Sequence, residues 1–385
     1  MGDDLNTFDY GIIGGGLSGL LSAYRMAEDP WFADKKIVII ETDEAKSNDR
    51  TWCYWEAGVG EWDALLHHSW MRALVRSHDD ERTLALAPYS YKMLRSADFY
   101  AHVKSYLKEC VHIEWRIDRV QQLVEQPGHV DVVVASGTLR CQHVLTSVGG
   151  LHSPLKANPH RLLWQHFGGW FIQTEQPTWD ASVVTLMDFS VVQRDGVCFM
   201  YVLPTAECHA LVEFTVFGPT AWPMEAYESL MADYLAHMGC VYTIEEKERG
   251  AIPMTVYPFE GNNTSRITHI GSAGGWTRPS TGYTFQASCQ RSAELIERLK
   301  TGRQAAPSWS HRHRAYDAVM LELMGNHPQK GVDFFMQIYK EQPIERVFRF
   351  LDGHSSFWDE LVIMWRARPR IALTRYLFAW LFRSR

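Results

Sequence analysis

Carboxyl groups within apolar runs are the first residues of this chain that could do chemistry. Glu213 lies in residues 210–217, A-L-V-E-F-T-V-F, a pattern typical of a buried strand. Burial disfavours the charged carboxylate and raises its pKa, so such a group can stay protonated near neutral pH and act as a general acid. The residues alone leave two alternatives open, an exposed position on an edge strand and a carboxylate paired with an arginine.

Two other acids have a similar setting. Asp188 lies in the apolar segment L-M-D-F and is a candidate either for relaying a proton or for capping a turn. Glu56 follows the aromatic segment T-W-C-Y-W and is a candidate for a second acid or for a structural cap. The sequence does not say which acid would donate a proton and which would accept one.

A glycine-rich segment near the N-terminus predicts a binding site for a dinucleotide. Gly14, Gly16 and Gly19 have the G-x-G-x-x-G spacing, after an apolar run and before an expected helix over residues 17–27 that contains Ser18. The helix N-terminus offers free N–H groups to phosphates. Glu41 ends the next apolar run, 22 residues after Gly19, where a carboxylate can accept a hydrogen bond from a ribose hydroxyl.

A second glycine-rich segment far downstream favours FAD over NAD as the bound cofactor. Residues 271–275 (G-S-A-G-G) and 279–283 (P-S-T-G-Y) follow a short strand and precede an expected helix over residues 284–300. In flavoproteins of the glutathione-reductase-like type, a segment far downstream in the sequence belongs again to the first domain. Its helix N-terminus is directed at the flavin ring. We expect Gly282 to donate its N–H to the ring. The other expected contacts are Gly271, Ser272, Gly274 and Tyr283.

Composition excludes several classes of function. The 385 residues carry a formal charge of -7, which argues against a nucleic-acid-binding protein. The seven cysteines form no C-x-x-C pair, and the paired histidines have no matching ligands, so we expect no metal site. No signal peptide and no apolar run of about 18 residues is visible, which favours the cytoplasm.

These patterns predict an α/β fold of the glutathione-reductase-like class, with an inserted antiparallel sheet and a helical C-terminal region. We expect a discontinuous FAD-binding domain over residues 1–160 and 250–305, and a β-rich substrate domain over 161–249. Residues 306–385 are expected to be helical, and residues 46–60 to form an irregular insert.

Several segments together resemble one family. Residues 48–56, N-D-R-T-W-C-Y-W-E, are similar to a segment of bacterial and plant lycopene cyclases, and the resemblance covers essentially the whole chain. The other matching segments follow in family order: residues 91–100, 165–170, 187–189, 211–215 and 278–285. The chain departs from the family pattern twice, with Phe214 in place of a second acid after Glu213 and with Ser272 in place of an aspartate.

The resemblance implies a redox-neutral reaction that needs FAD in its reduced form, with NAD(P)H as the source of electrons. The ψ-ends of lycopene would close to β-ionone rings, giving β-carotene through γ-carotene. Closure requires an acid, a dry pocket that tolerates a carbocation, and a base. Arg50 and Arg95 are candidates for anchoring the flavin. Candidates for lining the cation pocket are Trp52, Tyr54, Trp55 and Phe214.

Lycopene dissolves in bilayers, so the enzyme needs access to a membrane. Residues 371–382 are apolar and aromatic and have arginines on both sides, which favours an interfacial helix on the inner face of the cell membrane over a helix packed on the core. Three alternatives stay open: a flavin-dependent monooxygenase of the same fold, a cyclase of another polyene, and a protein that binds carotenoid or flavin without turnover.

Overall fold

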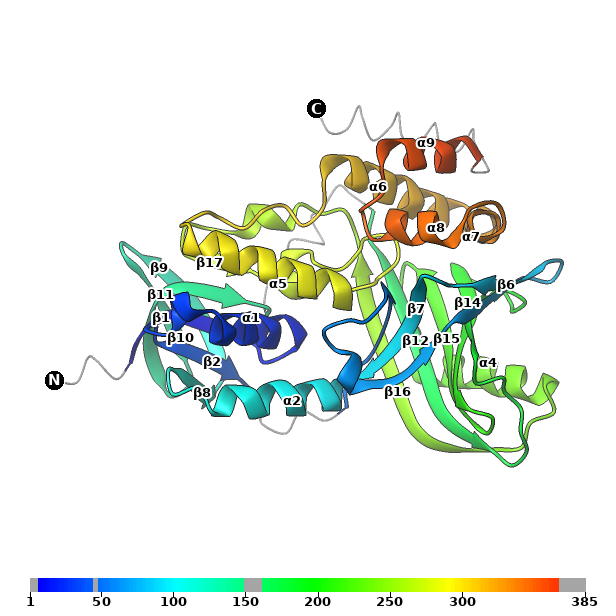
Figure 1. Cartoon of the computed structure of the whole chain (residues 1–385), viewed down its shortest axis with the longest axis horizontal. Coiled ribbons are helices and arrows are strands. Elements are labelled where there is room, and N and C mark those ends of the chain that lie inside the picture. Colours follow the sequence, from blue (N-terminus) through cyan, green and yellow to red (C-terminus); the bar gives the residue numbers. More distant parts are fainter. Residues whose placement is uncertain (1–5, 44–47, 149–160, 367–385) are drawn as a thin grey trace.

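The computed structural model describes residues 6–43, 48–148 and 161–366. Figure 1 shows a dinucleotide-binding region at the N-terminal end, a second β-rich region beside it, and a group of C-terminal helices. The predicted α/β class, with a parallel sheet, an antiparallel sheet and C-terminal helices, is confirmed.

The first sheet is the expected dinucleotide-binding sheet. Its parallel strands are β1 (Thr7–Ile13), β2 (Ile37–Glu41), β8 (Ile113–Ile117), β11 (Gly137–Thr146) and β17 (Ile267–His269). The hairpin β9 (Val120–Gln126) and β10 (His129–Val134) continues it antiparallel. Strand β2 is a continuous apolar run that is buried along its whole length, as expected for a central parallel strand.

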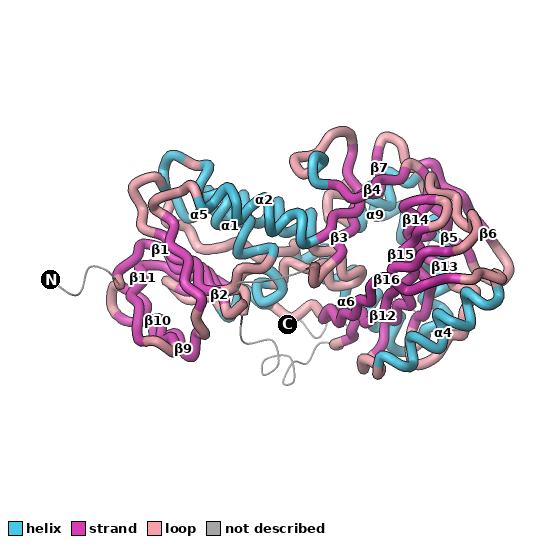
Figure 2. Tube along the Cα trace, turned by 90° about the horizontal axis from the view of Figure 1, so that it is seen from below, coloured by secondary structure: helices cyan, strands magenta, loops and turns pink. Residues whose placement is uncertain are grey.

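Three helices and four short 3₁₀ turns belong to this region. One face of the sheet is covered by α1 (Leu17–Glu28), α2 (Ser96–Lys108) and α5 (Phe285–Lys300), which share one apolar core with it (Figure 2). The 3₁₀ turns of the described chain are η1 (Pro30–Phe32), η2 (Asp63–Leu65), η3 (Phe259–Asn262) and η4 (Gly271–Gly274). Residues 267–300 therefore return to the first domain, as the late glycine segment predicts.

The second sheet is mostly antiparallel. Its strands in order are β16 (Tyr242–Met254), β12 (Leu163–Thr174), β15 (His209–Gly218), β14 (Val197–Ala206), β13 (Val183–Asp188), β5 (Arg72–Arg76) and β6 (Glu81–Ala85). Helix α4 (Met224–His237) covers one face. Strands β5 and β6 come from well before residue 161, and β5 pairs parallel to β13.

A small third sheet corrects one expectation. Residues 51–57 form strand β3 (Thr51–Ala57), which pairs with β7 (Tyr89–Arg95), and β7 pairs with β4 (Leu66–Trp70). The prediction of an irregular insert over residues 46–60 is therefore wrong for residues 51–57. Trp52 and Tyr54 share one face and contact Phe285. Trp55 points to the other face and stacks on Phe348, which is the period of a strand.

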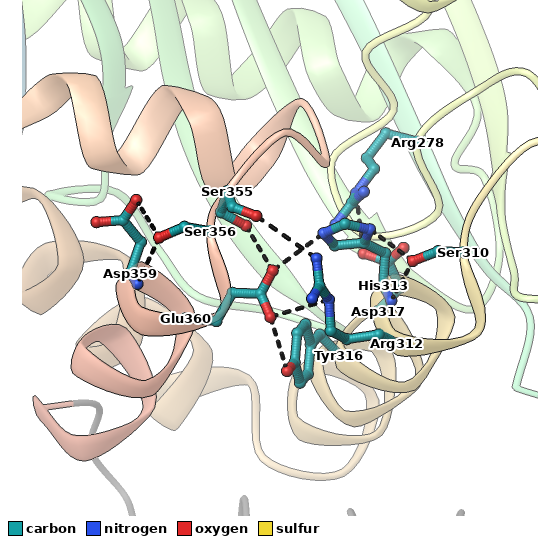
Figure 3. Close-up of polar contacts among 10 residues, drawn as sticks. All are labelled: Arg278, Ser310, Arg312, His313, Tyr316, Asp317, Ser355, Ser356, Asp359 and Glu360. Carbon is teal, nitrogen blue, oxygen red and sulfur yellow. Dashed lines mark hydrogen bonds and ion pairs between the residues drawn. The ribbon is translucent and has the colours of Figure 1, made fainter.

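The C-terminal helices α6 (His311–Asn326), α7 (Pro328–Glu341), α8 (Ile344–Leu351) and α9 (Phe357–Arg366) pack with the second sheet in one apolar core. Figure 3 shows how α9 is fixed to α6. The buried Glu360 carboxylate pairs with Arg312 at 3.1 Å and accepts hydrogen bonds from the Tyr316 and Ser355 hydroxyls at 3.0 and 2.8 Å. No helix in the described part of the chain is long and apolar enough to cross a membrane.

Candidate active site

A cavity of about 440 Å³ connects the glycine-rich loop of the first domain with the second sheet. Its volume lies within the range of small-molecule sites in proteins. Gly16, Ser18 and Ser272 line one part of it, and Glu213 and Thr215 line another. One cavity therefore joins the predicted cofactor residues to the predicted acid.

The glycine loop has the close packing that its spacing predicts. A Cβ atom at Gly19 would lie 1.9 Å from the Gly14 carbonyl oxygen, so only glycine lets α1 approach β1 this closely. Gly14 has a φ of +97° at the tight turn. The buried Glu41 carboxylate accepts the Gly15 N–H at 2.6 Å and does not line the cavity, so the predicted ribose acceptor sits against the glycine loop.

The late glycine segment meets the glycine loop at the cavity. Gly271 has a φ of +60°, and a Cβ there would lie 2.3 Å from the Ser18 hydroxyl oxygen. Gly271 and Ser272 both line the cavity. Gly274 does not line it, and its lack of a side chain leaves room for the His269 carbonyl.

Gly282 departs from its expected role. It lines the cavity, but its N–H donates to the Arg278 carbonyl at 2.9 Å, so it is not free to donate to a flavin ring as predicted. Tyr283 also lines the cavity, and its hydroxyl lies 3.1 Å from that of Tyr91. Arg278 is buried and pairs with Asp317 at 3.1 Å, which anchors this loop to α6 (Figure 3).

Three buried polar atoms on the cavity wall have no hydrogen-bond partner among the described residues. They are Gln165 Oε1, Thr281 Oγ1 and Ser288 Oγ. Buried polar groups in proteins are normally satisfied, so these atoms indicate a polar ligand. Together with the free N-terminal end of α1, they fit a cofactor that carries phosphates and a polar ring system, as FAD does.

Glu213 lies in the setting that the sequence predicts. Its side chain is buried on β15 and accepts a hydrogen bond from the Thr215 hydroxyl on the same face. Burial and the neighbouring Glu248 carboxyl raise the pKa of Glu213 well above its ordinary value of 4.5. The fold therefore favours the neutral carboxyl, which is the form that can donate a proton, and the exposed alternative is wrong.

Glu248 is a cavity residue that sequence reasoning missed. It lies on β16 and accepts the Thr51 hydroxyl at 2.8 Å, and its carboxyl is hydrogen-bonded to that of Glu213. Burial raises its pKa as well. Its segment, E-E-K-E-R, looks like the solvated face of a surface strand, and the signal that could have found it is the alternation that places Glu246, Glu248 and Gly250 on one face.

The other two predicted acids lie outside the cavity lining. Asp188 is buried, but Arg76 and Ser190 hydrogen-bond to it, which outweighs the effect of burial and holds its pKa below its ordinary value. Glu56 accepts a hydrogen bond from Lys92 at 2.8 Å. The structure thus gives both carboxylates a cationic partner and does not bring them to Glu213.

The predicted aromatic residues divide between the cavity and the core. Trp52 lines the cavity. Tyr54 stacks on Phe285 at 4.7 Å, and Trp55 stacks on Phe348 at 4.4 Å, so neither reaches the lining. Phe214 points away from Glu213 because neighbours on a strand face opposite sides, and it packs in the core under α4. For these three residues the predicted place in the pocket is wrong.

The two predicted arginines also differ. Arg50 lines the cavity near the glycine loop. Arg95 does not line it, and its guanidinium pairs with Glu246 at 2.6 Å and lies over the Phe171 ring at 3.9 Å. Arg95 nevertheless acts on the carboxyl pair, because its positive charge lowers the pKa of Glu248 against the effect of burial.

Comparison with solved structures supports the flavoprotein fold. A geranylgeranyl bacteriochlorophyll reductase-like protein from Thermoplasma acidophilum matches with a TM-score of 0.60 and 11% identity, over 97% of this chain and 99% of that one. The flavin-dependent monooxygenase PieE, solved in complex with FAD and substrate, matches with a TM-score of 0.59 and 13% identity, over 97% of this chain and 72% of that one.

Comparison of sequences identifies the family. Lycopene beta-cyclase of Pseudescherichia vulneris is 24% identical over 94% of each chain, and that of a Paracoccus species is 24% identical over 95% of each. The lycopene beta cyclase of Arabidopsis thaliana is 24% identical over 71% of this chain and 56% of its own. Residues 9–377 match the family model described as lycopene cyclase protein, and the chain therefore belongs to the lycopene cyclase family.

Proposed function

We propose that this chain is a lycopene β-cyclase that closes the ψ-ends of lycopene to β-ionone rings in a redox-neutral reaction, with reduced FAD bound in the cavity. The observation that carries the proposal is the buried Glu213 carboxyl, whose pKa is raised, in the same cavity as the glycine loop. Family membership supplies the substrate class.

Ring closure begins with a proton on C2 of the terminal alkene. Glu213 is the donor, since its raised pKa favours the protonated carboxyl and the Thr215 hydroxyl holds one of its oxygens in place. The resulting cation at C1 is attacked by the C5=C6 bond, and loss of the C6 proton completes the ring. No electrons are gained or lost overall.

The carbocation must be protected from water. Leu186, Phe199 and Phe335 are among the apolar side chains that line the cavity, and they exclude solvent that would trap the cation. Trp52 and Tyr201 add aromatic faces that attract positive charge. Bound in this cavity, reduced FAD would supply negative charge that stabilises the cation, with NAD(P)H as the source of its electrons.

Gly16, Leu17 and Ser18 at the start of α1 would hold the pyrophosphate of FAD. Gln165, Thr281 and Ser288 offer the unpartnered polar atoms that its ring system requires. Glu41, held beside the loop by the Gly15 N–H, is the residue that we assign to the ribose of FAD.

Helix α9 supports access to a membrane. Four large apolar side chains of this helix are exposed: Phe357, Trp358, Leu361 and Trp365. Trp358 and Trp365 each have 74% of their surface exposed to solvent. Their spacing places them on one stripe about 100° wide. We propose that this face lies in the bilayer surface, where tryptophan is favoured. The predicted interfacial helix at residues 371–382 lies outside the described residues.

The direct test is turnover of lycopene in liposomes by the anaerobic protein with reduced FAD. The wild-type chain is expected to give ring-closed products of unchanged mass. Glu213→Gln is expected to retain FAD and form no ring, since a carboxamide is far too weak an acid to protonate an alkene. A product heavier by one oxygen when air is admitted, with no ring closed, would instead identify a flavin-dependent monooxygenase.

A further inference from the structure

We propose that Glu248 is the second carboxyl of the site, which shares one proton with Glu213 and takes up the C6 proton after the ring has closed. This inference rests on the proposed function and assigns the base that the function leaves unassigned. It follows from the register of three strands, the contacts of both carboxyls and the geometry of the reaction.

The register brings the two side chains to one face. Gly169 on β12 pairs with Glu213 on β15 and also with Glu248 on β16. Residues directly opposite each other on paired strands point to the same side of the sheet. The two acids therefore stand on the same face, on either side of a single glycine.

The absence of a side chain at Gly169 leaves the space in which the two carboxyls meet. Neighbouring strands lie about 4.8 Å apart, so residues on β15 and β16 begin almost 10 Å apart at the backbone. A Cβ atom at position 169 would lie 3.0 Å from Glu248 Cγ and 3.3 Å from Glu248 Oε1. Glu248 thus extends over the glycine and reaches the hydrogen bond with Glu213.

The surrounding residues give the two carboxyls different affinities for the shared proton. Each carboxyl accepts one hydroxyl, Glu213 from Thr215 and Glu248 from Thr51. The cation that acts on the pair, Arg95 on β7, stabilises the charge of Glu248. The other titratable groups facing the two carboxyls are Glu246 on β16, Cys53 on β3 and Tyr201, which lies directly opposite Glu213 on β14. The shared proton therefore rests on Glu213, and Glu248 carries the negative charge.

The reaction needs a donor and an acceptor side by side. The proton enters at C2 and leaves from C6, and in the closed ring C1 alone separates these two atoms. Two carboxyls in contact match this spacing, whereas Asp188 and Glu56 do not reach the cavity. Glu213 gives its proton to C2, and Glu248 receives the proton of C6 as the C6–H bond pair forms the C5=C6 bond. The pair ends with one proton, as it began, and returns to its starting state by moving that proton back to Glu213.

The test combines turnover with an infrared titration of the protein labelled with ¹³C only in glutamate, so that buried aspartates do not contribute. At pH 7 the wild type is expected to show a protonated glutamic acid band that Glu213→Gln removes. In Glu248→Gln the band should persist but titrate about one pH unit lower, because the like charge is gone. Ring formation by Glu248→Gln should fall about 100-fold or more.

Glu245→Gln is the matched control, because Glu245 is an exposed acid on the opposite face of the same strand. It should change neither the band nor turnover. If Glu248→Gln does not fold, Gly169→Ala tests the same contact with both acids retained, and it should lower turnover by pushing Glu248 aside.

Wild-type turnover in Glu248→Gln, or a Glu213 band that titrates at the same pH with and without Glu248, would overturn the proposal. A wild-type protein that closes no ring would contradict the proposed function instead, and the titration would still decide whether the two carboxyls share a proton.

Discussion

At the scale of single residues, the proposed proton donor is a group whose neutral form the fold favours. Glu213 binds its proton more tightly in the folded chain than in the unfolded chain, because burial and Glu248 oppose its charge. The folded state therefore binds more protons between the ordinary pKa of 4.5 and the raised one. In that pH window the free energy of unfolding falls as pH rises.

Glu213→Gln removes this dependence of the free energy of unfolding on pH. We expect the variant to be more stable than the wild type at and above neutral pH. Between the ordinary and the raised pKa of Glu213, the difference in the free energy of unfolding should grow by about 1.4 kcal/mol for each pH unit. Thermal melting between pH 4 and pH 9 would measure it. Glu245→Gln, at an exposed position, serves as the control. A melting temperature of Glu213→Gln that follows the wild type across this range would mean that Glu213 is ionised in the fold.

At the scale of elements, the approach of α1 to β1 decides whether the cofactor site forms. In Gly19→Ala the new methyl group would overlap the Gly14 carbonyl oxygen, which lies 1.9 Å from the Cβ position. We expect a loss of about 1–3 kcal/mol of stability, together with loss of bound FAD as α1 moves from the loop. Gly261→Ala, where a Cβ meets nothing within 4 Å, is the control. Denaturant unfolding and flavin absorbance measure both effects, and full FAD content in Gly19→Ala would refute this role of the helix.

The elements also show which features could be predicted from the sequence. The glycine loop, Glu41 at the end of β2, and the late return through β17 and α5 could be predicted because local spacing dictates them. Glu248 could not, because its partner is 35 residues away and its setting depends on the pairing of β12 with two strands.

Position 214 makes the same point. A second acid there would face α4 and not the cavity, so Phe214 removes no carboxyl from the face of Glu213. Tyr54, Trp55 and Glu56 were misplaced for a related reason: a strand shows its period in sequence, but not which of its faces meets the cavity.

At the scale of the whole molecule, the proposed contact with the bilayer depends on the exposed aromatic face of α9. Trp358→Ala combined with Trp365→Ala should weaken binding to liposomes by about tenfold or more, since two large apolar side chains no longer enter the interface. Trp31→Ala, an exposed tryptophan on η1, is the control. Liposome flotation gives the measurement, and equal binding of the double variant and the wild type would place the membrane contact elsewhere.

The central claim is that an acid of this protein closes the ring without net oxidation or reduction. It is tested most directly by the mass of the product that the anaerobic protein with reduced FAD forms from lycopene in D₂O. In the first turnover of protein equilibrated in D₂O, before a C6 proton has been returned to Glu213, protonation at C2 from an exchangeable carboxyl predicts one deuterium for each ring closed, with no added oxygen and no net change in the number of hydrogen atoms. A ring-closed product without deuterium, or one changed in its oxidation state, would contradict it.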